Sequence, residues 1–279
     1  MNLIDTHAHL TWEDFRDDLP AVLQRSKEAG VETVINIGAD LDSSTKALRL
    51  AQGEPQSQSG IIFYSTIGLH PHEVTKMPSD VSIHENVGKL EEIYQSNPKK
   101  IVAAGECGLD YHFAGVDFSP TTISEEEQKA LQKKLFIAQI DLAKKLNLPM
   151  IIHSRDSWQD IFVPHLEGTR GVFHSFTGTS EQARKVLALG FYLGFTCIVT
   201  YPKNETLRQI IKEIPLDKIL IETDCPYLPP QSMRGQRNEP ANVLEVAKVI
   251  AQMKNTAVEE VARATLENAC KLFNLEYNI

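Results

Sequence analysis

Eight short apolar runs divide the chain, and longer stretches, most of them with helical spacing, separate these runs. Each run is apolar almost throughout, which is typical of strands that are covered on both faces. The alternation of strands with helices indicates parallel strand pairing. The pattern therefore predicts the α/β fold class, as a (β/α)₈ TIM barrel. The runs lie near residues 2–8, 31–38, 61–69, 101–106, 149–154, 171–175, 191–199 and 218–223.

The stretches between the runs repeat apolar residues every three or four positions, as amphipathic helices do. Two further helical stretches follow the last run, so we expect one C-terminal helix more than a minimal barrel has. No internal repeat or linker divides the sequence, and we expect residues 1–279 to form a single domain. The predicted helices cover residues 17–29, 43–51, 81–94, 125–146, 180–189, 205–214, 242–253 and 257–273.

Composition sets further bounds on the molecule. The chain has 279 residues, 42% of them hydrophobic, and this length suits a barrel. No uninterrupted apolar span approaches about 20 residues, and no basic segment precedes an apolar core at the start. The four cysteines form no C-x-x-C pair, which favours reduced thiols. We therefore expect a cytoplasmic protein that does not bind membranes.

The net charge argues against a broad nucleic-acid-binding surface. The formal net charge is −9 at pH 7, whereas affinity for a polyanion normally draws on clustered lysine and arginine side chains. A substrate that carries phosphate must therefore be held locally, by a few side chains at one site.

His7 and His9 end the first apolar run, two positions apart. Residues i and i+2 of a strand point to the same side, so both imidazoles face one side at the carboxyl end of this strand. A single residue of this kind is usually a buried histidine with a hydrogen bond, or a carboxylate that caps a helix. Four more candidates each end their own apolar run, which indicates a metal site. They are Glu106, His153, His174 and Asp224.

These six side chains predict two divalent ions. A buried, unpaired carboxylate costs about several kcal/mol, so strands this apolar should not end in one without a compensating cation. Imidazole nitrogens and carboxylate oxygens suit Zn²⁺, Mn²⁺ or Mg²⁺, and six ligands are enough for two ions that share a bridging carboxylate. In this fold the carboxyl ends of the strands meet at one face, where ligands distant in sequence converge.

Seven motifs in order resemble the TatD family of metal-dependent deoxyribonucleases, within the amidohydrolase-like metal barrels. They are DTHAH at 5–9, GLHPH at 68–72, GECGLDY at 105–111, IHSR at 152–155, FHSFTG at 173–178, ETDCPYL at 222–228 and RGQRNEP at 234–240. The resemblance covers essentially the whole chain. It implies metal-dependent hydrolysis of phosphodiester bonds in DNA, in a 3′–5′ exonuclease-like manner on single strands or ends. It also places the six candidate ligands on the metal positions of the family.

The residues suggest roles that agree with this resemblance. We predict that Glu106 is the bridging carboxylate, since it lies between the strand-1 pair and the histidines of strands 5 and 6. Asp224 could both bind metal and accept a proton from an attacking water molecule, and Glu106 and Asp224 are therefore the predicted catalytic residues. The substrate is expected to be DNA, and the protein is expected to act as a monomer.

Four further residues are predicted to bind the substrate. Arg155, Arg234 and Arg237 are candidate phosphate clamps, because a guanidinium can engage phosphate oxygens through paired donors. His70 ends the third run and could donate to a phosphate oxygen. An arginine in a surface loop is often only solvated, and Tyr111, a candidate for stacking on a base, could equally be a packing residue.

The sequence departs from the family pattern at two places, and two other functions stay open. The loop over 112–127 is long, and Gln236 stands where the family commonly has a lysine, which bears on DNA binding. The same barrel and ligands would serve a hydrolase of C–N or ester bonds, such as an aminoacyl ester on RNA. A non-catalytic, metal-stabilised scaffold is disfavoured, because a structural site needs only one closed ion.

Overall fold

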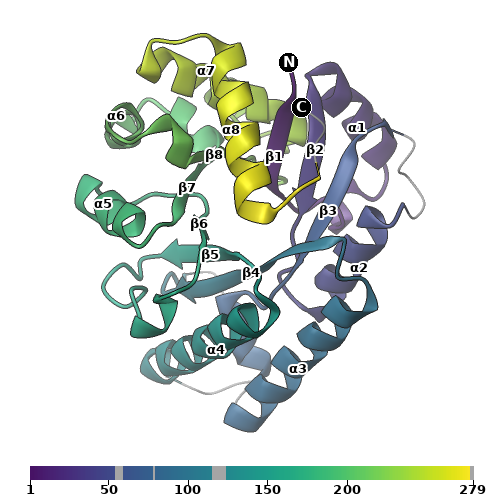
Figure 1. Cartoon of the computed structure of the whole chain (residues 1–279), viewed down its shortest axis with the longest axis vertical. Helices are drawn as coiled ribbons and strands as arrows, with labels where there is room; N and C mark the ends of the chain where they lie inside the picture. The colour runs from purple at the N-terminus through teal and green to yellow at the C-terminus, as the bar shows by residue number, and fades with distance from the viewer. Residues whose placement is uncertain (54–58, 78, 115–123, 277–279) are drawn as a thin grey trace.

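A single eight-stranded sheet forms the centre of the computed structural model, which describes residues 1–53, 59–77, 79–114 and 124–276 (Figure 1). The strands lie in chain order, and each pairs in parallel with the next. A bridge between Ala8 and Cys225 joins the two edges, so the sheet forms a nearly closed barrel. The predicted TIM barrel is confirmed. The strands are β1 (Leu3–Ala8), β2 (Val31–Asn36), β3 (Ile62–Ile67), β4 (Ile101–Asp110), β5 (Met150–Arg155), β6 (Gly171–Phe173), β7 (Tyr192–Phe195) and β8 (Ile219–Ile221).

Helices surround the barrel, and several begin where the sequence supplies a capping side chain. Asp40, Ser79, Ser124 and Thr179 each accept a hydrogen bond from the backbone N–H three residues further on. These caps fix the starts of helices that the apolar spacing alone locates to within a few residues. The helices are α1 (Leu19–Glu28), α2 (Leu41–Ala51), α3 (Asp80–Ser96), α4 (Glu125–Leu146), α5 (Ser180–Ala188), α6 (Glu205–Glu213), α7 (Val243–Lys254) and α8 (Val258–Phe273).

The predicted additional helix, α8, covers one end of the barrel (Figure 1). Leu266 and Phe273 on α8 share an apolar cluster with buried side chains from seven of the strands, and Tyr64 of β3 packs against this cluster. The Asn268 amide donates to the carbonyl oxygens of Leu216 and Ile219, at the amino end of β8. Since α8 lies at the amino end, the opposite end, formed by the carboxyl ends of the strands, is left for the predicted site.

Strand β4 is longer than predicted and ends at Asp110 instead of Glu106. The apolar run alone predicts an end at Glu106, because the first charged residue stands there. The strand continues past Glu106 because position 108 is a glycine. Gly108 has a φ of +142°, and any other residue there would place a Cβ 2.1 Å from the carbonyl oxygen of His153. The register against β5 also shifts between Ala104 and Cys107, and such bulges redirect side chains. Glu106 therefore lies within its strand and not at the end of it.

Strand β7 is shorter than predicted. Tyr192–Phe195 forms the strand, and Cys197–Thr200 turns into a 3₁₀ helix although Ile198 and Val199 are apolar and β-branched. These apolar side chains are buried by packing against neighbouring helices, which an apolar run alone does not distinguish from strand pairing. Within the described parts of the chain, the helices are too short or too polar to cross a membrane.

Candidate metal centre and substrate pocket

All six predicted metal ligands meet at the carboxyl end of the barrel. His7 lies on β1 and His9 directly after it, Glu106 on β4 and His153 on β5. His174 follows the last residue of β6, and Asp224 lies three residues beyond β8. The left-handed backbone of Asp224, with a φ of +57°, and the hydrogen bond from its N–H to the His7 carbonyl oxygen at 2.8 Å fix it beside β1.

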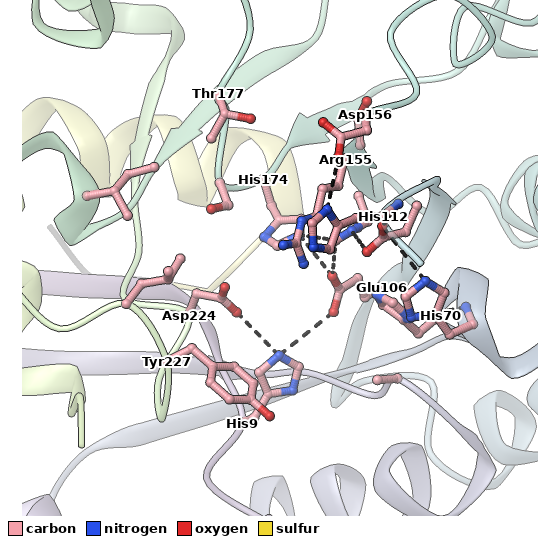
Figure 2. A pocket seen from close by; sticks show the side chains of 18 of the residues that line it. His9, His70, Glu106, His112, Arg155, Asp156, His174, Thr177, Asp224 and Tyr227 are labelled. Atoms are coloured by element: carbon pink, nitrogen blue, oxygen red, sulfur yellow. Dashed lines mark hydrogen bonds and ion pairs between the residues drawn. The ribbon is translucent and has the colours of Figure 1, made fainter. Parts of the chain in front are cut away.

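The Glu106 carboxylate lies between two groups of imidazoles. Its Oε2 is 3.6 Å from Nε2 of His7 and 3.8 Å from Nε2 of His9. Its Oε1 is 2.7 Å from Nδ1 of His153 and 2.9 Å from Nε2 of His174. Figure 2 shows this carboxylate between His9 and His174, with Asp224 on the side of His9. Each carboxylate oxygen therefore faces a different pair of imidazole nitrogens.

The first group has the spacing of a metal site. Nε2 of His7 and Nε2 of His9 lie 3.3 Å apart, and each lies 3.5 Å from Oδ1 of Asp224. Four ligands at bond lengths of about 2.1 Å in a tetrahedron lie roughly 3.4 Å from one another. The residues thus fit a divalent cation, and the mixture of nitrogen and oxygen donors suits Zn²⁺ or Mn²⁺. A further group within 4.8 Å consists of His70, Glu106 and His153.

The charges of these groups depend on one another. Burial opposes ionisation of Glu106, but the imidazoles of His174, His153 and His7 outweigh it and hold the pKa of this carboxyl well below its usual range. Burial also opposes protonation of His174, yet Glu106 and Glu222 raise the pKa of this imidazole well above its usual value. Protons on histidine thus balance the buried carboxylates, and binding of a cation would displace such protons.

Two carboxylates that sequence reasoning missed lie beside two of the histidines. Oδ2 of Asp110 lies 3.0 Å from Nε2 of His153, on the side of the ring away from Glu106. Oε1 of Glu222 lies 3.7 Å from Nδ1 of His174. Such partners set the tautomer and the orientation of a metal-binding imidazole. Spacing is the signal that could have found both, because Asp110 is four residues from Glu106 on one strand and Glu222 is two residues from Asp224.

Asp5 ties the first strand to the segment that carries Asp224. Its side chain is fully buried and accepts hydrogen bonds from the backbone N–H and the hydroxyl of Thr223. Burial raises the pKa of Asp5 to about 8, although the hydrogen bonds from Thr223 and His7 lower it. These bonds hold the edges of the barrel together beside the metal centre.

A pocket of about 1050 Å³ opens above the metal centre. Of the predicted substrate-binding residues, Arg155 and His70 line it, and Lys203 is a further cation that the prediction missed. Nδ1 of His70 accepts a hydrogen bond from the backbone N–H of His72 at 3.3 Å. Burial lowers the pKa of His70 to about 3, and the neighbouring His153 adds to the effect, so this imidazole is neutral at pH 7.

The structure does not bring Arg234 and Arg237 to the wall of this pocket. Arg237 donates to both carboxylate oxygens of Asp18, at 2.9 and 2.7 Å, and its guanidinium carbon lies 4.6 Å from the centre of the Phe15 ring. It therefore links the loop after β8 to the start of α1. Arg234 lies over the ring of Tyr201, with its guanidinium carbon 4.9 Å from the ring centre, and Tyr201 itself lines the pocket.

Two other expectations concern the β4 side of the pocket. Tyr111 does not line the pocket; its hydroxyl donates to Oδ2 of Asp160 at 2.9 Å, as a packing residue would. Of the long loop over 112–127, His112 and Ala114 line the pocket, whereas 115–123 lie outside the described residues.

Comparisons with known proteins agree with this geometry. The family model for TatD related DNase matches residues 4–274. An uncharacterized metal-dependent hydrolase of Bacillus subtilis, YabD, is 39% identical over 277 residues, which cover 98% of this chain and 99% of that protein. The 3′-5′ ssDNA/RNA exonuclease TatD of Erwinia tasmaniensis is 33% identical over 98% of this chain and all (100%) of that protein. The crystal structure of YjjV, a TatD homologue from Escherichia coli K12, matches with a TM-score of 0.83 at 32% identity, over 98% of each chain. The chain therefore belongs to the TatD family of metal-dependent hydrolases.

Proposed function

We propose that this chain hydrolyses phosphodiester bonds in DNA with the help of two divalent ions, from the ends of single strands and in the 3′–5′ direction. The observation that carries the proposal is the position of Glu106, whose two carboxylate oxygens face different pairs of histidines. The relative from Erwinia tasmaniensis, which matches over 98% of this chain and 100% of its own length, is named a 3′-5′ ssDNA/RNA exonuclease. This name supports the choice of substrate and direction.

The ligands divide into two sets around this carboxylate. His7, His9, Asp224 and Glu106 would hold one ion, while Glu106, His153 and His174 would hold the other. Bound divalent ions supply Lewis acidity, which lowers the pKa of water and offsets negative charge on a phosphoryl group and its leaving oxygen. The hydrogen bond to Asp110 keeps the imidazole of His153 in place, and Glu222 faces the imidazole of His174.

Asp224 accepts the proton of the attacking water molecule. Its side chain is 16% exposed, whereas that of Glu106 is 6% exposed, so Asp224 is the carboxylate that water in the pocket reaches more easily. The same carboxylate then delivers the proton to the leaving oxygen, which regenerates the ionised Asp224 for the next turnover.

His70 and Arg155 orient the phosphate. Nδ1 of His70 accepts a backbone hydrogen bond, so a neutral ring carries its proton on Nε2 and can donate it to a phosphate oxygen. The exposed Arg155 follows His153 and Ser154 on β5 and adds a guanidinium at the wall of the pocket. Neither side chain is needed to hold an ion in this assignment.

Replacing Arg155 with alanine is expected to raise KM for single-stranded DNA by roughly 10- to 150-fold, because one charged hydrogen bond to the phosphate is lost. Metal content should stay unchanged, since Arg155 lies outside both ligand sets. Steady-state kinetics and metal analysis of the two proteins measure this. Arg184→Ala, which removes an exposed arginine on α5, is the matched control. An unchanged KM would remove Arg155 from the phosphate site.

Turnover of defined substrates tests the proposed function. Metal-free protein is supplied with Mg²⁺, Mn²⁺ or Zn²⁺ and mixed with single-stranded DNA, RNA, linear duplex DNA, closed circular duplex DNA or a carboxylic ester. We expect metal-dependent release of mononucleotides from the 3′ end of single-stranded DNA, and slow or no cleavage of the closed circle. Binding should depend weakly on salt, because a chain of net charge −9 neutralises few phosphates. Hydrolysis of the ester without cleavage of any nucleic acid would favour the alternative hydrolase function.

A further inference from the structure

Two aromatic side chains stand at the mouth of the pocket beside the metal centre. The ring of Trp12 is stacked on His9, with 4.2 Å between the ring centres and 29° between the planes. The ring of Tyr227 meets Trp12 edge to face, with 5.6 Å between the centres. Both residues line the pocket, and Figure 2 shows Tyr227 beside His9 and Asp224. The pair thus adjoins the candidate ligands His9 and Asp224.

The exposure of Tyr227 is not explained by packing. The residue is 56% exposed, one of the few large apolar residues that the described chain leaves in solvent. Tyr201, on the same side of the pocket, is 8% exposed, and its hydroxyl donates to the carbonyl oxygen of Pro229 at 2.8 Å. The backbone of Tyr227 is nevertheless fixed, since its N–H donates to the carbonyl oxygen of Asp224 at 3.0 Å. A fixed backbone with an exposed ring is suited to bind a flat apolar ligand.

We propose that Trp12 and Tyr227 form a stacking site for the base of the nucleotide whose phosphate lies at the metal centre. The inference rests on the proposed function and adds a base-binding site to it. Aromatic rings bind every base through its face, so such a site gives affinity without sequence preference. A base is also exposed for stacking in a single strand, whereas in a duplex it is paired and stacked on its neighbours.

The charges on this side of the pocket indicate where the strand continues. Lys203 lines the pocket near Tyr201, and the guanidinium of Arg234 covers the Tyr201 ring from the loop after β8. A phosphate next to the stacked nucleotide would meet Lys203, while Asp40, Glu73 and Asp156 line the pocket from the loops after β2, β3 and β5. The strand therefore runs from the metal centre past Tyr227 toward Lys203.

Tyr227→Ala tests the stacking site in the full-length, metal-loaded enzyme. We expect KM for a single-stranded oligonucleotide to rise by about 5- to 150-fold, with a smaller change in kcat. Tyr227→Phe keeps the ring and should restore most of the affinity. Val81→Ala, at a 68% exposed apolar position on α3, is the control for loss of surface apolar area. The exposed position of Tyr227 makes a folding defect unexpected, and circular dichroism checks this.

A substrate without the base separates stacking from other effects of the substitution. Oligonucleotides with an abasic residue at one of the last two positions are compared with intact ones. At the stacked position the abasic residue should raise KM of the wild-type enzyme, and Tyr227→Ala should then add little, because both changes remove the same contact. Independent, additive effects, or an unchanged KM for Tyr227→Ala on the intact strand, would overturn the stacking site and leave the proposed function standing. Failure of the wild-type enzyme to cleave any oligonucleotide would reject the proposed function and this site with it.

Discussion

Replacing Glu106 with alanine is expected to release both divalent ions and to lower kcat by on the order of a thousandfold or more. The reason is geometric, because Oε2 faces His7 and His9 while Oε1 faces His153 and His174. Loss of this one side chain takes a ligand from each ion. Metal analysis after gel filtration and single-strand turnover measure the two effects, and circular dichroism shows whether the barrel is retained.

The matched control for this prediction is Asp42→Ala. Asp42 is a carboxylate on α2 whose side chain is 72% exposed and pairs with Lys46 at 2.6 Å, outside the pocket. The Asp42→Ala protein should have the metal content and the kcat of the wild type. Retention of one full equivalent of metal by a folded Glu106→Ala protein would show that Glu106 is not shared between two ions.

Asp224→Asn is expected to lower kcat by about 10²- to 10⁴-fold, the usual contribution of a general base. Asparagine keeps the shape of the side chain and tolerates the left-handed backbone at φ +57°, whereas alanine there would add strain. Because His7, His9 and Glu106 remain, this variant should keep more metal than Glu106→Ala does. Dividing kcat by the amount of bound metal therefore separates the two effects. A low quotient indicates loss of proton transfer, whereas an unchanged quotient indicates only loss of the ion.

The pH dependence of kcat gives a second measurement for Asp224. Burial opposes ionisation of this side chain, but the His9, His7 and His174 imidazoles outweigh burial and hold the pKa of Asp224 below its usual value. In the wild type with both ions bound, kcat should therefore fall only at acidic pH, as this carboxylate is protonated, and this part of the acidic limb should be lost in Asp224→Asn. Asp156→Asn, an exposed carboxylate at the rim of the same pocket, is the control and should keep the acidic limb. A fully active Asp224→Asn enzyme would leave Asp224 without a catalytic role.

Sequence reasoning reached the barrel and placed the six candidate ligands at one end of it, because both leave local signals. Each strand is an apolar run, and five of the six candidate ligands lie between two residues before the end of a strand and three residues beyond it, so position along the chain translates into position in space. Glu106 is the exception. It ends the apolar run in the sequence, but its strand continues for four more residues, to Asp110. Glycine at position 108 was the local sign that the strand could continue past the charge.

The surroundings of the ligands could not be predicted in the same way, because they depend on contacts between distant segments. The motif around Arg237 predicts a phosphate-binding residue. In the structure, however, its guanidinium donates to the carboxylate of Asp18, more than 200 residues earlier in the chain. Trp12 and Tyr227 lie on loops after different strands, and only the closed barrel brings them together. Asp110 belongs to a motif, but its contact with His153 depends on the register between β4 and β5.

Titration of the metal-free protein tests the two-ion account most directly. Mn²⁺ is added in steps, bound metal is measured at each step, and the rate of single-stranded DNA hydrolysis is recorded on the same sample. The account predicts that turnover rises until two ions are bound per chain and then levels off. Full turnover with one bound ion, or no turnover with two, would contradict it.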